Sequence, residues 1–251
     1  MTAQAVTLPI TPPSIIPGFQ RPSGTARGRI WCYHGLNGHP STFFSSAPFD
    51  SLLSGLLADG WQVVIPGEMY SGASQATSSQ AVFTGDGTKG ASFRAAVLAL
   101  HQQTKKWVDA VYGPPPGGLD VLLGISWGGL MVELLAGSGV PFRALLSHVA
   151  ASNPSYMTEF SGDDLTSLQP SPRALPNRRP VWISYSTSDT RVGYADTAGG
   201  IGTKTIADTW AAVNPNVTVR GGAGDTYYIG LGHSTDATVV SHMLAWIGAL
   251  P

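Results

Sequence analysis

The sequence predicts an α/β protein whose mostly parallel β-sheet carries helices on both faces. Short apolar runs of strand length alternate with longer segments in which apolar residues recur at helical spacing. No internal repeat and no linker interrupts this alternation, and 251 residues suffice for one large α/β domain. Helices that connect parallel strands cross over in a right-handed sense, so such an alternation covers both faces of the sheet.

In the first half of the chain, regular structure is expected to begin near Arg29. Residues 1–27 are Pro-rich and aperiodic, and we expect an irregular N-terminal arm or edge strands there. Apolar and aromatic runs then predict buried strands at 30–33, 61–65 and 119–123. Helical spacing of apolar residues predicts helices over 52–57 and 93–111.

The second half continues the same alternation to the C-terminus. Strands are predicted at 142–149, 181–185 and 217–219, and helices at 130–135, 198–213 and 239–247. Two segments lack periodicity, 68–90 and 151–178, and are predicted to be long loops. The second of them would be a small cap or loop insert within a domain that spans residues 28–251.

Composition excludes several classes of function. The formal net charge is −1 and only 12% of residues are charged, so no basic surface is expected to attract nucleic acid or anionic lipid. The hydrophobic share of 43% still supports a folded core. Cys32 is the one cysteine, which excludes an internal disulfide and a CxxC site, and its apolar neighbours predict a buried, inert thiol.

No membrane or targeting segment is expected from the sequence. The first twenty residues contain no Lys or Arg, and prolines interrupt their apolar stretch, unlike a secretory signal. No run of eighteen apolar residues occurs that would predict a transmembrane helix. The charge-poor composition favours an extracellular or virion-associated protein, but the sequence leaves the compartment and the oligomeric state open.

The most informative motif is the segment Gly124-Ile125-Ser126-Trp127-Gly128, which has the pattern GxSxG. It lies between a predicted buried strand and a predicted amphipathic helix, as a nucleophile elbow requires. Glycines on both sides of Ser126 allow close approach of neighbouring backbone. The alternative is a Gly-rich phosphate-binding turn, but neither a GxGxxG fingerprint nor a following GK[ST] accompanies it.

Taken with this motif, the order of strands, loops and helices over about residues 28–250 resembles the α/β-hydrolase family. The resemblance implies that Ser126 is a nucleophile, with His233 as its base in the loop before the last helix. It implies Asp189 as the orienting acid, although serine replaces the usual glycine in the turn before it. Asp196 and Asp225 remain competing candidates for the acid. The chain order Ser126, Asp189, His233 agrees with that of the family.

The same resemblance implies an oxyanion hole made of two backbone N–H groups. One would come from Trp127, at the start of the helix after the nucleophile. The other would come from Leu36, because His34-Gly35-Leu36-Asn37-Gly38 resembles the HGxxG loop of the family. No cluster of His, Cys or acidic residues has the spacing of metal ligands, and the implied chemistry needs neither a metal nor an organic cofactor.

Aromatic residues in the loops expected around Ser126 suggest the kind of substrate. The predicted binding residues are Phe43, Tyr70 and Tyr156, with Phe44, Trp127 and Tyr227 as further candidates. Such uncharged side chains suit an apolar acyl or aromatic group. The leading hypothesis is therefore a carboxylic-ester hydrolase acting on a small-molecule or polymer-borne ester. The alternatives are a peptidase, amidase or acyltransferase with the same triad, or a non-catalytic module that keeps the fold.

Overall fold

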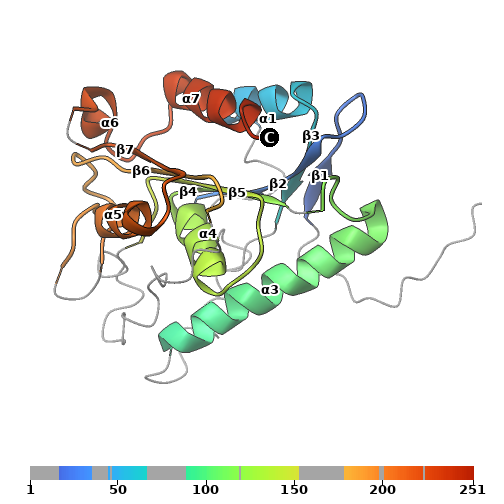
Figure 1. Cartoon of the computed structure of the whole chain (residues 1–251), viewed down its shortest axis with the longest axis horizontal. Coiled ribbons are helices and arrows are strands. Elements are labelled where there is room, and N and C mark those ends of the chain that lie inside the picture. The colour runs from blue at the N-terminus through green and yellow to red at the C-terminus, as the bar shows by residue number, and fades with distance from the viewer. Residues whose placement is uncertain are drawn as a thin grey trace, which may run out of the picture.

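The computed structural model (Figure 1) describes residues 17–35, 45, 47–66, 89–118, 120–152, 178–197, 201–222 and 224–251, without the side chains of 89–94 and 96. Within these residues, seven strands form one sheet in the order β1-β3-β2-β4-β5-β6-β7. Every neighbouring pair from β3 to β7 is parallel, and β1 alone runs antiparallel, against β3. The predicted mostly parallel sheet is thus confirmed.

Strands and helices alternate along the chain. The strands are β1 (Gly18–Gln20), β2 (Gly28–Tyr33), β3 (Trp61–Ile65), β4 (Val121–Ile125), β5 (Ala144–His148), β6 (Val181–Ser184) and β7 (Val217–Arg220). The helices are α1 (Phe49–Ala58), α3 (Lys89–Tyr112), α4 (Trp127–Gly137), α5 (Thr203–Val213), α6 (Thr226–Gly230) and α7 (Ala237–Gly248).

Two apolar cores lie on the two faces of the sheet because successive strand residues point in opposite directions. Along β2, Ile30 and Cys32 enter the core beneath α1 and α7, and Trp31 and Tyr33 enter the core beneath α3, α4 and α5. Figure 1 shows these helices on the two sides of the sheet, as predicted. Cys32 is a fully buried free thiol, also as predicted.

Some element boundaries differ from the sequence prediction. Strand β4 extends to Ile125, so the first two residues of the GxSxG motif complete the strand. Helix α5 begins at Thr203, and residues 198–200 of the predicted helix lie outside the described residues. The short helix α6 was not predicted, and its five residues are too few for a clear periodic signal. Of the predicted loops 68–90 and 151–178, most residues lie outside the described part.

None of the helices in the described ranges has the length and apolar character needed to cross a bilayer. The division into residues 1–27 and 28–251 stays a prediction. Within the first segment the structure describes β1, which pairs with β3 at the edge of the sheet.

A buried polar network fixes α4 against β5. Glu133 of α4 is fully buried and accepts hydrogen bonds from Ser147 Oγ at 2.8 Å and Ser152 Oγ at 2.6 Å. Thr203 Oγ1, at the start of α5, donates to the Ala150 carbonyl and lies 3.0 Å from Ser152 Oγ. The carboxylate therefore joins α4 to the chain that leaves β5.

Burial raises the pKa of Glu133 to about 7, and the hydrogen bonds from Ser152 and Ser147 only partly oppose that shift. The folded protein then holds a proton on Glu133 between about pH 4.5 and 7, where the unfolded chain has lost it. The free energy of unfolding must fall as the pH rises through this interval, by roughly 3 kcal/mol from this one group.

We predict that Glu133→Gln removes this pH dependence because glutamine keeps the shape without the charge. Urea unfolding of both proteins between pH 5 and 8 measures it. The variant should gain stability relative to the natural protein as the pH rises toward 8. If the difference in unfolding free energy between the two proteins stays constant over this range, the pH dependence of stability does not come from Glu133.

Candidate active site

Ser126 occupies a sharp turn between β4 and α4. Its backbone has φ 58° and ψ −117°, which places a non-glycine residue in the left-handed half of conformational space. Its N–H donates to the His148 carbonyl at 2.9 Å, and its carbonyl accepts from Ala151 N–H at 3.0 Å. These bonds hold the conformation and leave the side chain at the carboxyl edge of the sheet.

Two glycines allow this turn to form. A Cβ on Gly124 would lie 2.1 Å from the Gly128 carbonyl oxygen, and a Cβ on Gly128 would lie 2.0 Å from the Tyr33 carbonyl oxygen. Both contacts are with backbone, which cannot move aside without disturbing β2 or α4. The spacing of the GxSxG motif therefore reflects close packing of β2, β4 and α4.

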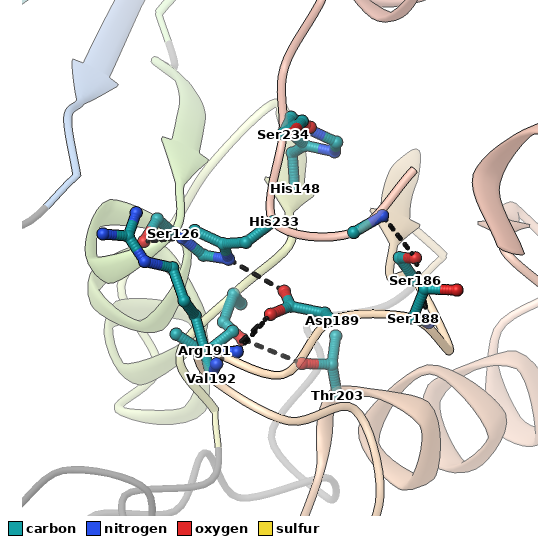
Figure 2. Close-up of polar contacts among 12 residues, drawn as sticks. Ser126, His148, Ser186, Ser188, Asp189, Arg191, Val192, Thr203, His233 and Ser234 are labelled. Carbon is teal, nitrogen blue, oxygen red and sulfur yellow. Dashed lines mark hydrogen bonds and ion pairs between the residues drawn. The ribbon is translucent and has the colours of Figure 1, made fainter. Parts of the chain in front are cut away.

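Ser126, His233 and Asp189 meet at this edge (Figure 2). Ser126 Oγ lies 2.8 Å from His233 Nε2, and His233 Nδ1 lies 2.8 Å from Asp189 Oδ2. Ser126 comes from the turn after β4, Asp189 from the loop after β6 and His233 from the loop before α7. Carboxyl ends of parallel strands share one edge of a sheet, so residues distant in sequence converge there.

The acid is buried and well supplied with hydrogen-bond donors. Burial alone would raise the pKa of Asp189, but the bond and charge of His233 and the N–H groups of Arg191 and Val192 outweigh it and lower the pKa. Its Oδ1 accepts from those two N–H groups at 2.9 and 3.3 Å. Oδ2 is left for the imidazole, so the carboxylate fixes the orientation of the ring.

The competing acids have other roles. Asp196 accepts from Gly202 N–H at 2.8 Å and from Thr205 Oγ1 at 2.9 Å at the start of α5. Asp225 precedes α6 as its N-cap and lies 3.4 Å from an Arg220 nitrogen. Asp225 thus has the helix-capping role typical of aspartate, and Asp196 links the segment before α5 to the start of that helix. Of the three candidate acids, Asp189 is the one whose carboxylate contacts His233.

The geometry around the predicted oxyanion hole is partly described. Trp127 opens α4, so its backbone N–H belongs to the electropositive start of that helix. Its indole is buried in the core beneath α3, α4 and α5, so Trp127 was wrong as a candidate cleft-lining side chain. Leu36 lies outside the described residues. Its neighbour Gly35 packs on Ser126: a Cβ there would lie 3.8 Å from Ser126 Oγ.

The predicted substrate-binding residues Phe43, Tyr70 and Tyr156, and the further candidate Phe44, also lie outside the described part of the chain. Tyr227 is 39% exposed, and its hydroxyl bonds to Asp236. Among the described side chains, no group of three or more His, Cys, Asp or Glu is placed to hold a metal ion.

Ser186, the serine that replaces the family's usual glycine in the turn before Asp189, supports the acid and histidine loops together, a role that the sequence did not predict. Its Oγ accepts from Gly232 N–H at 2.9 Å and donates to the Ile229 carbonyl at 2.8 Å. Ser186 lies just before Asp189, and Gly232 just before His233. The signal in the sequence is this replacement of glycine by serine, which does not itself indicate a contact with the histidine loop.

Comparison with known proteins gives a fold but no near relative. No protein-family model and no curated protein matches the sequence. Many solved structures resemble it. Esterase PE8 aligns with a TM-score of 0.60 at 11% identity over 93% of this chain and 98% of its own. A cold-adapted esterase from an Arctic intertidal metagenomic library aligns with a TM-score of 0.62 at 16% identity, over 93% of this chain and 87% of the esterase.

A peptidase is among these structures as well. The acylaminoacyl peptidase of Pyrococcus horikoshii aligns with a TM-score of 0.64 at 12% identity, over 93% of this chain and 39% of the peptidase. Such low identities establish the architecture and not the substrate. Together with the sheet order and the turn at Ser126, they show that the chain has the α/β-hydrolase fold.

Proposed function

We propose that this protein is a serine hydrolase that cleaves carboxylic esters through an acyl-enzyme intermediate. The observation that carries the proposal is the continuous contact from Ser126 Oγ to His233 Nε2 and from His233 Nδ1 to Asp189 Oδ2, each 2.8 Å long. A non-catalytic module has no need to keep nucleophile, base and acid in this alignment at one sheet edge.

Acylation begins at the serine hydroxyl, which is a weak nucleophile at neutral pH. His233 Nε2 accepts the Ser126 proton as Oγ attacks the acyl carbon, and it then gives the proton to the departing alcohol. Asp189 holds a hydrogen on Nδ1, so that Nε2 keeps its lone pair for this transfer. The aspartate also stabilises the positive charge that forms on the imidazole.

The developing oxyanion needs donors that are already in place. We assign the Trp127 N–H and the Leu36 N–H to this role, and each such donor is worth about 3 kcal/mol of transition-state stabilisation. Gly35 supports the assignment because its Cα faces the nucleophile without a side chain that would fill the space. In the second half of the reaction, His233 activates a water molecule that hydrolyses the acyl-enzyme.

Esters are the favoured substrates, and we propose Phe43, Tyr70 and Tyr156 as residues that bind their apolar part. Similarity to two esterases supports an ester, either small or borne by a polymer. Similarity to an acylaminoacyl peptidase supports the alternative of a peptide or amide substrate. An ester releases its alcohol more readily than an amide releases its amine. Rates measured on a panel of ester and amide substrates therefore distinguish an esterase from a peptidase or amidase.

We predict that the natural protein hydrolyses short-chain p-nitrophenyl esters and reacts covalently with a fluorophosphonate probe. Ser126→Ala should abolish labelling and lower ester turnover by at least about 10⁴-fold, because no other group replaces the nucleophile. Labelling is measured by intact-mass spectrometry, and turnover by release of p-nitrophenol. The same panel includes p-nitroanilides to compare amide cleavage.

The control for this experiment is Ser241→Ala, which changes an exposed serine on α7. It should react like the natural protein. Undiminished labelling of Ser126→Ala would show that another residue is the nucleophile. Cleavage of anilides at rates comparable to esters would favour the peptidase alternative.

We predict that Asp189→Asn lowers kcat by roughly a thousandfold or more. The Arg191 and Val192 N–H groups keep the amide oxygen on their side, so the amide NH₂ faces His233 Nδ1. The ring must then carry its hydrogen on Nε2, where it cannot accept the proton of Ser126. Steady-state kinetics with a p-nitrophenyl ester measures the loss.

Asp225→Asn is the matched control because it makes the same chemical change at a helix cap. Its kcat should stay within about twofold of the natural value, since asparagine caps a helix as well as aspartate does. A large loss in Asp225→Asn with little loss in Asp189→Asn would overturn the assignment of the acid.

A further inference from the structure

A second histidine, His148, lies directly beside the proposed catalytic residues. It is the last residue of β5, in register with Ile125 of β4 and Ser184 of β6, and it is fully buried. In the structure its polar groups contact both parts of the site that must meet, the nucleophile turn and the histidine loop. Figure 2 shows His148 beside Ser234 of the histidine loop.

Its backbone holds the nucleophile. The His148 carbonyl accepts the Ser126 N–H at 2.9 Å. Three residues later, the Ala151 N–H donates to the Ser126 carbonyl at 3.0 Å. The chain that leaves β5 therefore binds both backbone polar groups of the strained Ser126.

Its side chain holds the base. His148 Nε2 lies 3.0 Å from the carbonyl of Ser234, the residue that follows His233. A carbonyl only accepts, so Nε2 must carry the hydrogen. His148 Nδ1 then accepts from Ser184 Oγ–H at 2.6 Å in the neutral ring. One tautomer satisfies both contacts, and the ring cannot rotate without losing both.

The surroundings keep this ring neutral. The pKa of His148 is lowered to about 4, mainly by burial and also by the nearby charge of His233, while the Ser234 bond and the charges of Asp189 and Asp236 partly oppose this shift. The Trp182 ring lies parallel to the His148 ring, with 6.5 Å between the ring centroids. The Tyr228 ring packs edge-on, with 6.4 Å between the centroids. At neutral pH the side chain therefore has one donor and one acceptor in fixed places.

We propose that His148 is a positioning residue that sets the distance between nucleophile and base, because its carbonyl binds Ser126 and its Nε2–H binds the carbonyl next to His233. This inference rests on the proposed serine hydrolase function. Ser186 fixes the other side of the loop through Gly232 N–H, so Ser186 and His148 hold the backbone on the two sides of His233. Losing it would let the imidazole move relative to Ser126 Oγ, without changing the groups that bind substrate.

The test uses variants of the full chain assayed with a p-nitrophenyl ester and a fluorophosphonate. His148→Phe keeps a buried ring and removes the donor. We expect its kcat and its labelling rate to fall together by roughly 10- to 100-fold, with KM within about threefold, because a misplaced base slows chemistry and not binding. His148→Gln can offer an amide N–H near the former Nε2 and should restore kcat to within about fivefold.

His101→Phe is the matched control. His101 is also buried, with a pKa lowered to about 4 by burial, and its Nδ1 lies 2.6 Å from the Tyr33 hydroxyl on α3's side of the sheet. Its loss should lower the melting temperature as His148→Phe does and leave kcat within about twofold. Equal kcat values for the two phenylalanine variants would overturn the proposal.

The glutamine variant separates positioning from packing. If His148→Gln is no faster than His148→Phe, the Nε2 donor is not what places the loop, and the proposal is wrong. If His148→Phe does not fold, His148→Gln is compared with His148→Asn, whose shorter amide ends nearer to Nδ1; equal kcat values would again overturn it. If Ser126→Ala itself stays active, the proposed function fails instead.

Discussion

The backbone of Ser126 is the constraint on which the site depends. A serine with φ 58° is strained, and such strain persists only where the surroundings determine the conformation. Here β2 supplies carbonyls that pack against Gly128, and the end of β5 binds both polar groups of the Ser126 backbone. The sheet must therefore form before the hydroxyl is presented. This explains why a site of three residues joined by two polar contacts needs parallel strands and two apolar cores behind it.

Hydrogen bonds also connect the three loops at the edge of the sheet. The His148 carbonyl binds Ser126, the His148 ring binds the carbonyl of Ser234, and Ser186 joins the loop of His233 to the turn that carries Asp189. The triad contacts complete a closed ring of interactions. Ser126 and Asp189 are held by their own backbone hydrogen bonds, and His233 by those of its neighbours Gly232 and Ser234, so catalysis would not have to order these loops at each turnover. Preorganisation of this kind is a large part of how enzymes lower barriers.

Much of this was predictable from the sequence, for definite reasons. Buried parallel strands read as apolar runs, so 61–65 was predicted with its observed boundaries, and the turn at Ser126 was marked by glycines that no other residue can replace. The order of elements placed His233 and favoured Asp189. The features that the sequence did not predict depend on long-range packing. The role of Ser186 comes from contacts with residues 43 and 46 positions away in the sequence. Trp127 was expected to line a cleft, but its indole lies in the core. Local patterns do not encode such contacts.

The most direct test of the central claim is a crystal structure of the protein after reaction with a fluorophosphonate. Our account predicts a covalent bond from phosphorus to Ser126 Oγ, a phosphonyl oxygen within hydrogen-bonding distance of the Trp127 N–H, and the imidazole of His233 still in contact with Asp189. An adduct on a different side chain, or one on Ser126 whose phosphonyl oxygen points away from the start of α4, would contradict it.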